Sequence, residues 1–338
     1  MKPTDKTRRQ VATLALAALM LPASPARAQA PTRLRVKTFP GAQNLALFAA
    51  LHKGLFAAQG LDVDLQFTQN SVELRNGLAA GDFEIAHAAV DNAVAMRETA
   101  GHDVVIFLGG DNSMNELFVQ PEILTPEELR GRTLIVDAPN TAYALQAKKI
   151  LLQAGLKRGD YEIKVVGGTF QRVNAMKEER GNSASTLNPP FSIQAREAGL
   201  RSLGRVVDLI GPYQATCAFA IRAWANTHGD AVQRYITAYV LALRWATAPA
   251  QRGEVTALLA SRLKLAPALA AQTYAALVEP GYGLAPDARF DREGFANVLA
   301  LRAEIEGPGS GGGTGAPPPQ DRYADLHWYE AALKALPR

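Results

Sequence analysis

From residue 34 onward, short apolar runs alternate with longer stretches in which apolar residues recur every three or four positions. The short runs are typical of strands and the longer stretches of helices. Residues 34–37 begin the series as a strand, and residues 44–59 follow as a helix with Leu45 and Phe48 on one face. Regular alternation of this kind predicts an α/β protein with largely parallel sheets.

Strands and helices are predicted along the rest of the chain from the same patterns. Ser71 is a candidate cap for a helix because its hydroxyl accepts backbone N–H bonds. Further strands are predicted at 63–67, 83–88, 104–108, 134–136, 161–166, 184–187 and 216–221. Further helices are predicted at 71–80, 93–99 and 141–154, over much of 231–306, and at 322–336.

Two breaks interrupt this pattern at places suited to a crossing between lobes. Gly109 and Gly110 follow the strand at 104–108, and Gly211 precedes Pro212 shortly before the strand at 216–221. The segment 307–320 is rich in Gly and Pro and is expected to be a flexible surface linker. The chain therefore reads as two α/β lobes connected twice.

Composition and charge narrow the class of protein. The chain has 338 residues, 48% of them hydrophobic, which is enough for two well-buried cores. It carries 36 basic and 32 acidic residues, but five basic residues and one acid lie before residue 29. Without that segment the chain has 31 of each, so its charge does not predict a nucleic-acid partner.

The N-terminal segment contains, in the order found in export signals, a basic region, an apolar region and a peptidase site. Residues 1–10 are basic, residues 11–21 are apolar but too few to span a bilayer, and Ala26 and Ala28 offer a peptidase site. We expect residues 1–28 to be a signal peptide, with cleavage after Ala28. Arg8 and Arg9 resemble a twin-arginine signal, and the general secretory route stays open. These features predict a soluble periplasmic protein, in which the single cysteine, Cys217, forms no intramolecular disulfide and is buried.

Several short motifs resemble those of one transport family. They are LHKGLF at 51–56, GLDV at 60–63, LAAGDFEIAH at 78–87, LTPEELRGRTL at 124–134 and the NPP that begins at Asn188. The stretch from about 34 to 305 is similar to the solute-binding proteins of ABC importers for nitrate, taurine, alkanesulfonates and thiamine-pyrimidine precursors.

This resemblance implies a periplasmic binding protein fold of type II, with a ligand cleft between two α/β lobes joined by two crossovers. Lobe one would comprise residues 31–111 and 217–338, and lobe two residues 112–216. The implied partners are a small-molecule ligand and, at the inner membrane, an ABC permease with its ATPase subunit. We expect no cofactor, a monomeric state, and a ligand that is a small organic molecule, either anionic or aromatic: a sulfonate, a carboxylate or a pyrimidine-like compound.

In open α/β sheets, ligands bind where loops leave the carboxyl ends of the strands. In lobe one, Phe39 is a candidate for stacking on the ligand or for a core turn. Asn70 and Ser71 would donate to an anion or cap a helix. Asp91 and Asn92 would contact ligand or cap the next helix, and Asp91 is a possible partner for a ring nitrogen or an amine.

In lobe two, the loop at 139–143 enters a helix, whose free N–H groups and positive dipole end form a seat for an anionic group. Thr141 is the strongest candidate here, with its hydroxyl and adjacent N–H groups as donors, and Asn140 and Tyr143 lie beside it. Asn188 and Phe191 follow a later strand of the same lobe and are expected to face the cleft.

The sequence contains no recognisable catalytic arrangement. The five histidines are scattered without metal-ligand spacing, and there is no phosphate-binding loop or serine elbow. We therefore expect a binding protein rather than an enzyme. Two alternatives stay open: an enzyme of the same fold, such as a decarboxylase or a pyrimidine-precursor synthase, and a ligand sensor for a membrane signalling partner.

Overall fold

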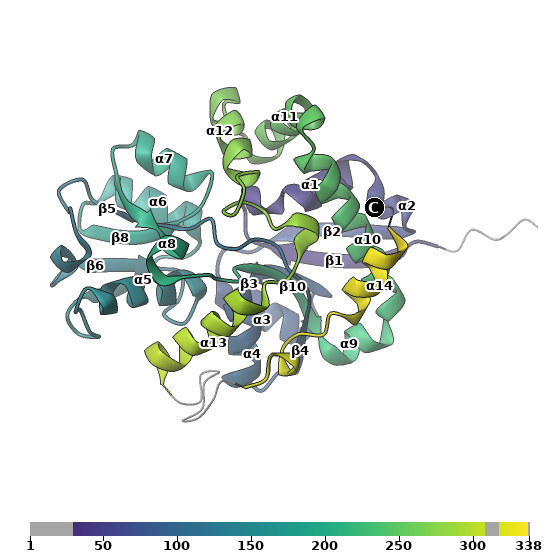
Figure 1. Ribbon diagram of the computed structural model, residues 1–338, viewed down its shortest axis with the longest axis horizontal. Helices are drawn as coiled ribbons and strands as arrows, with labels where there is room; N and C mark the ends of the chain where they lie inside the picture. The colour runs from purple at the N-terminus through teal and green to yellow at the C-terminus, as the bar shows by residue number, and fades with distance from the viewer. Residues whose placement is uncertain (1–29, 308–317, 337–338) are drawn as a thin grey trace, which may run out of the picture. The chain divides into compact units, whose positions relative to one another are not determined.

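The computed structural model describes residues 30–307 and 318–336, and Pro31–Arg338 forms one compact unit. The predicted signal peptide and most of the predicted linker at 307–320 lie outside the described residues. Within the unit, helices pack on two separate five-stranded sheets, and each sheet with its helices forms one α/β lobe (Figure 1).

The first sheet has the strand order β2-β1-β3-β10-β4. Four of its strands run in the same direction, whereas β10 runs antiparallel to both of its neighbours. Its strands are β1 (Thr32–Thr38), β2 (Leu61–Phe67), β3 (Ile85–Ala89), β4 (Val104–Leu108) and β10 (Thr216–Ile221).

The second sheet has the order β7-β6-β8-β5-β9, with β6 parallel to β7 and β8, and β5 antiparallel to β8 and β9. Its strands are β5 (Glu116–Val119), β6 (Thr133–Val136), β7 (Glu162–Val165), β8 (Asn182–Leu187) and β9 (Arg201–Arg205). The chain therefore leaves the first sheet after β4 and returns to it at β10. The two α/β lobes and two crossovers confirm the predicted fold class, and the lobe boundaries at 111/112 and 216/217 stay predictions.

Each sheet has an apolar core on both faces, which explains why a strand such as β4 reads as a continuous apolar run. In β4, Val105 and Phe107 pack into one apolar core, while Val104 and Ile106 pack into the core on the opposite face. Cys217 of β10 lies in this second core and is buried, as expected. Burial also raises the pKa of its thiol.

Helices of the first lobe cover both faces of its sheet. One face packs against α1 (Leu45–His52), α10 (Gly229–Thr247) and α14 (His327–Ala335). The other face packs against α3 (Ser71–Ala80), α4 (Val90–Glu98) and α13 (Arg292–Glu306). The remaining helices of this lobe are α2 (Leu55–Ala58), α9 (Arg222–Thr227), α11 (Arg252–Leu263) and α12 (Pro267–Leu277).

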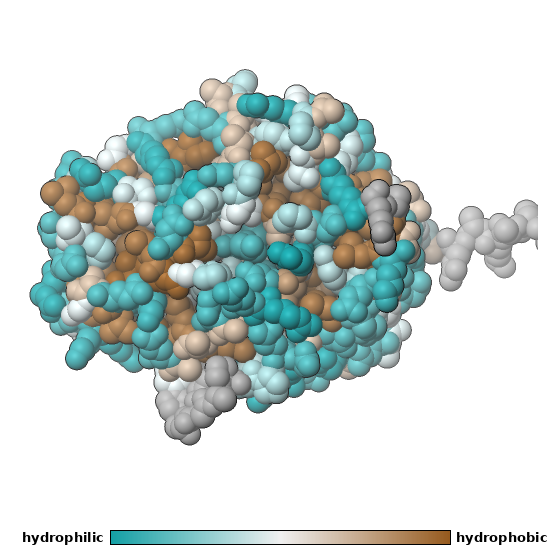
Figure 2. All heavy atoms as spheres, viewed as in Figure 1, coloured by the Kyte–Doolittle hydropathy of each residue, from teal (hydrophilic) through white to brown (hydrophobic). Residues whose placement is uncertain are grey.

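The second lobe carries α5 (Ala142–Gln153), α6 (Thr169–Glu178), α7 (Phe191–Glu197) and α8 (Val206–Ile210). Its two cores again lie on opposite faces, with Leu134 and Val136 of β6 on one and Ile135 on the other. Hydrophilic residues cover most of the face seen in Figure 2, with smaller hydrophobic areas between them. No helix in the described part of the chain is long and apolar enough to cross a membrane.

The structure corrects several predicted elements. The single helix expected at 44–59 is two helices, because Gly54 adopts a left-handed φ of 67° between α1 and α2. The cap of α3 is Asn70, whose side chain accepts from the N–H of Glu73, so Ser71 is not the cap. The last helix begins at His327 rather than 322, and the strands β5 and β9 were not predicted.

Candidate functional site

A cavity of about 30 Å³ lies between the lobes, where β1, β3 and β6 end. We call it the inner cavity. Both lobes contribute to its wall. Its lining residues are Thr38, Phe39, Gln43, Asn44, Ser71, His87, Ala88, Ala89, Asn92, Asp137, Thr141, Tyr143, Thr216 and Tyr239.

Half of the predicted site residues line this cavity: Phe39, Ser71, Asn92, Thr141 and Tyr143. The cavity holds no more than about two water molecules, since one water needs roughly 10–15 Å³ measured in this way. The structure thus brings five predicted residues from four loops together around a small polar space.

The Ser and Thr hydroxyl groups that line the inner cavity already donate their protons to protein acceptors. Thr38 donates to Oδ1 of Asn44 at 2.8 Å, and Ser71 donates across the lobes to Oδ2 of Asp137. Thr216 donates to Oδ2 of Asp111. Because a hydroxyl has only one proton, these groups meet a ligand as acceptors while the bonds are in place.

The hydroxyl proton of Thr141 is also engaged within the protein, which differs from the expected role of Thr141 as a donor to the ligand. It is the N-cap residue of α5, and its Oγ1 donates to the backbone oxygen of Ala138 at 2.9 Å. The hydroxyl proton expected for an anionic ligand is therefore already engaged. The helix N-terminus that Thr141 opens borders the cavity, and its role as a seat for an anionic group stays a prediction.

Asn92 has the one lining side chain with an unpaired buried oxygen. It lies in the first turn of α4, is 2% exposed, and donates from Nδ2 to the backbone oxygen of Ala89 at 3.3 Å. Its Oδ1 has no hydrogen-bond partner within the described part of the chain. Buried polar atoms are rarely left unpaired, so this oxygen marks a place for a donor that is not part of the protein.

His87 forms the aromatic side of the cavity together with Tyr239. Its Nε2 is 2.7 Å from the hydroxyl of Tyr235, and its ring stacks on Tyr239 with 5.2 Å between centroids. Burial lowers the pKa of His87 to about 3, because water no longer solvates the charged form. The imidazole is therefore neutral at physiological pH.

Arg172 of α6 places a buried positive charge behind Tyr143. It is fully buried, donates to Ser185 Oγ and Thr186 O at 2.8 Å each, and lies 4.8 Å from the centre of the Tyr143 ring. Burial lowers the pKa of Arg172 and raises that of Tyr143 to about 12. The guanidinium thus acts on the cavity through the ring of Tyr143.

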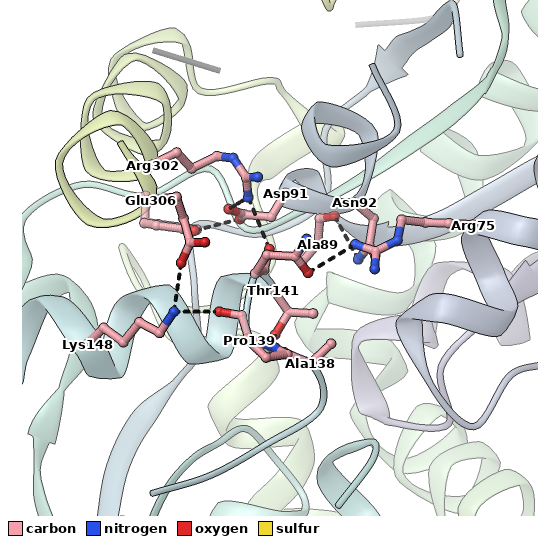
Figure 3. Close-up of polar contacts among 12 residues, drawn as sticks. Arg75, Ala89, Asp91, Asn92, Ala138, Pro139, Thr141, Lys148, Arg302 and Glu306 are labelled. Atoms are coloured by element: carbon pink, nitrogen blue, oxygen red, sulfur yellow. Dashed lines mark hydrogen bonds and ion pairs between the residues drawn. The ribbon is translucent and has the colours of Figure 1, made fainter. Parts of the chain in front are cut away.

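Asp91 and Asn140 lie outside the inner cavity. Asp91 belongs to a polar network with Arg302 (Figure 3). Arg302 of α13 bonds Asp91 Oδ1 at 3.0 Å and the backbone oxygen of Asn140 at 3.1 Å. The hydroxyl of Tyr213 donates to Asp91 Oδ2 at 2.6 Å. Asp91 is therefore paired with protein groups instead of the expected ring nitrogen or amine, and α13 connects the two lobes.

Asn70, Asn188 and Phe191 also lie outside the inner cavity. Asn70 caps α3, and Nδ2 of Asn188 donates across the lobes to Oε1 of Gln43 at 3.4 Å. Phe191 lines a second, larger cavity of about 560 Å³, which we call the outer chamber. The outer chamber is lined by Pro40, Gly41, Phe67, Gln69, Phe170, Gln171, Pro190, Phe191, Gln194, Arg262, Leu263, Lys264 and Leu265.

Several lining residues were not predicted. Asp137 directly follows β6, so the rule that selected the other loops applies to it as well. Thr216 and Tyr239 come from β10 and α10, and no local pattern distinguishes them from core residues. Within the described residues, no group of three or more His, Cys, Asp or Glu side chains could hold a metal ion.

The two lobes with their mixed sheets and the cavity between them define a periplasmic binding protein fold. The family described as NMT1/THI5 like matches residues 42–251, which is more than half of the chain. The protein therefore belongs to the NMT1/THI5-like family. None of the curated proteins matches the chain.

Solved structures of low sequence identity share this fold. A protein of Bordetella bronchiseptica RB50 has a TM-score of 0.77 at 20% identity, covering 90% of this chain and 97% of its own. The periplasmic nitrate-binding protein NrtA from Synechocystis PCC 6803 has a TM-score of 0.73 at 14% identity, with coverage of 90% and 89%. The alkanesulfonate-binding protein SsuA from Xanthomonas axonopodis pv. citri, bound to MOPS, has a TM-score of 0.68 at 16% identity, with coverage of 82% and 94%.

Proposed function

We propose that the protein is the periplasmic solute-binding component of an ABC importer. It would capture a small organic molecule between its lobes and present the closed form to a permease and its ATPase subunit, without transforming the molecule. Family membership and fold support this class of function. The observation that carries it is a cavity walled by both lobes, with the unpaired Oδ1 of Asn92 in its lining.

The lining atoms favour a solute that donates hydrogen bonds. Asn92 Oδ1 is an open acceptor, Asp137 adds a carboxylate, and the nearby Ser and Thr protons are engaged. Among the residues that the structure describes, no Lys or Arg lines the inner cavity. Among the ligand classes expected from sequence, a pyrimidine-like compound with ring or amino N–H donors fits this lining better than a carboxylate or sulfonate placed against Asp137.

Thermal-shift screening of residues 29–338 tests this proposal. Aminopyrimidines, aromatic carboxylates and sulfonates are compared, because a solute that binds only the folded state raises the melting temperature. We expect an N–H donor among the stabilising compounds, and mass spectrometry should recover it intact after incubation. Turnover of the compound by the pure protein would contradict a pure binding role.

The variant Asn92→Leu separates binding from folding. Leucine has a similar size and removes the unpaired oxygen, so the free energy of unfolding without ligand should change by less than about 1 kcal/mol. Affinity for the stabilising solute should fall about tenfold or more, since the donor loses its buried partner. The control Asn226→Leu makes the same change at an exposed position of α9 and should leave affinity unchanged. Normal binding by Asn92→Leu would place the solute elsewhere.

Export and transport are tested in cells. N-terminal sequencing of periplasmic material should give Gln29 as the first residue. Deletion of the gene should abolish uptake of the stabilising solute, whereas uptake without the protein would argue against a transport role.

A further inference from the structure

The inner cavity is too small to enclose an organic molecule in the arrangement of the lobes that the structure has. Sites for small organic ligands usually measure about 300–1,000 Å³, whereas this cavity measures about 30 Å³. The outer chamber, at about 560 Å³, falls within the usual range. A solute held by the inner cavity therefore needs a neighbouring space for its body.

The two cavities share the loops that form them. Phe39 lines the inner cavity and Pro40 the outer chamber; likewise, Ser71 lines the first and Gln69 the second. On the opposite lobe, Asn188 bonds Gln43 of the inner lining and lies two residues before Pro190 of the outer chamber. Short loop segments therefore connect the linings of the two spaces.

The outer chamber is apolar and is built from both lobes. Phe67 ends β2 in the first lobe, while Phe170 and Phe191 belong to α6 and α7 in the second. The rings of Phe170 and Phe191 are 6.1 Å apart between centroids and tilted by 59°. Phe67 and Phe170 remain 44% and 54% exposed. Exposed aromatic faces from two sides suit a flat aromatic group between them.

Positive charge at the wall of the outer chamber is a second feature that a ligand would have to match, besides the aromatic rings. Arg262 and Lys264 line it, and no acidic residue does. Neither cation forms a hydrogen bond or an ion pair with any residue of the described chain. Lys264 has a left-handed φ of 54° at the C-cap of α11, a position that most often carries glycine. The wall thus presents two uncompensated positive charges next to apolar rings.

We infer that the outer chamber binds the aromatic, anionic body of the solute whose donor end enters the inner cavity. This inference rests on the proposed function. The solute class is an aromatic anion that carries N–H donors at its far end. Phe67, Phe170 and Phe191 cover its ring, and Arg262 and Lys264 neutralise its charge.

Two fluorescent probes with related rings test the chamber. The first, 8-anilinonaphthalene-1-sulfonate, is an aromatic anion, and the second, N-phenyl-1-naphthylamine, lacks the sulfonate. The anionic probe should bind the intact protein one to one, and Phe170→Ala should weaken it about fivefold or more. Arg262→Gln combined with Lys264→Gly should weaken the anionic probe about fivefold and the neutral probe less than twofold.

Two control variants make matched changes away from the chamber. Lys177→Gln removes an exposed cation of α6, and Leu124→Ala removes an apolar side chain that is 58% exposed. Both should bind the anionic probe as the unchanged protein does. Equal loss of both probes in the charge variant, or normal probe binding by Phe170→Ala, would overturn the inference.

Two further readouts distinguish the outcomes. If light scattering shows that the probe dissociates a dimer, the chamber is an interface between copies and the inference is overturned. If a stabilising solute depends on Asn92 but is unaffected by Phe170→Ala, the proposed function stands and the outer chamber is not its site. Dependence of the same solute on both residues supports the inference.

Discussion

At the scale of single residues, the ion pair of Asp91 and Arg302 is the most completely buried charge interaction in the site region. The two side chains are 0% and 1% exposed. Arg302→Met should cost about 3–5 kcal/mol in the free energy of unfolding, because the buried Asp91 carboxylate keeps the hydrogen bond from Tyr213 but loses its compensating positive charge.

The double variant Asp91→Leu with Arg302→Met provides the control for this prediction. It removes both charges, so urea unfolding should recover much of the stability that the single variant loses. A double variant less stable than Arg302→Met would show that the pair acts through its other contacts instead of its charge balance.

His87 should make stability depend on pH. Its pKa is about 3 when folded, against an ordinary value of 6.5. Between these values the unfolded chain takes up a proton that the folded protein does not, so stability falls as the pH is lowered through this window. One such group contributes a slope of about 1.4 kcal/mol per pH unit.

The variant His87→Gln has no titrating group at this position. Urea unfolding from about pH 7 to about pH 3 should therefore give a flatter curve than the unchanged protein. Parallel curves would mean that His87 is not held neutral by burial.

Sequence alone predicted which loops meet between the lobes better than it predicted the hydrogen bonds of their side chains. The rule for loops after strands selected Ser71, Asn92 and Thr141, and the structure gathers all three. The roles of Thr141 and Asp91 depend on Ala138 and Arg302, the second of which is distant in sequence. Which proton is engaged, and which charge is paired, follows from tertiary contacts that no local pattern contains.

At the scale of elements, the break between α1 and α2 gives a clean test of backbone conformation. Gly54 has a left-handed φ of 67° and nothing within 4 Å of an added Cβ. Gly54→Ala should therefore lower the free energy of unfolding by about 1 kcal/mol, through backbone strain alone.

Gly253 is the matched control, since it lies within α11, has ordinary helical conformation and also has free space around an added Cβ. Gly253→Ala should raise the free energy of unfolding by about 0.5–1 kcal/mol, a change opposite in sign to that of Gly54→Ala. Thermal unfolding measures both. The same sign for the two variants would contradict the backbone explanation.

Buried strands were easier to predict than short, polar ones. The strand at 104–108 is apolar throughout and was located residue for residue. In contrast, β9 reads RSLGR and has no buried residue, so its strand conformation depends on pairing with β5. The helix break at Gly54 is a single-residue signal within an otherwise helical pattern.

At the scale of the whole molecule, polar contacts connect the two lobes. Arg205 of β9 bonds both carboxylate oxygens of Glu279, just after α12, at 2.8 and 2.9 Å. Its guanidinium also lies 3.9 Å from the ring centre of Tyr282. These groups hold the second lobe against the helical part of the first.

Glu279→Gln should weaken this contact and shift the ligand-free protein toward the open form. Small-angle scattering should then show a larger radius of gyration without solute, and apparent affinity should fall because less of the protein is closed. Glu254→Gln, which changes an acid on α11 that pairs with Lys53 within the same lobe, is the control. An equal effect of both variants would show that the change is not specific to the interface.

The position of β10 constrains the order in which this chain assembles. It lies between β3 and β4, although it follows the entire second sheet in the sequence. During synthesis, β4 has no neighbour to pair with until residues 216–221 leave the ribosome. The second lobe, which is continuous in sequence, can nucleate first, whereas the first must wait for this distant insertion. The lobe whose residues are made earliest is therefore the last to be completed.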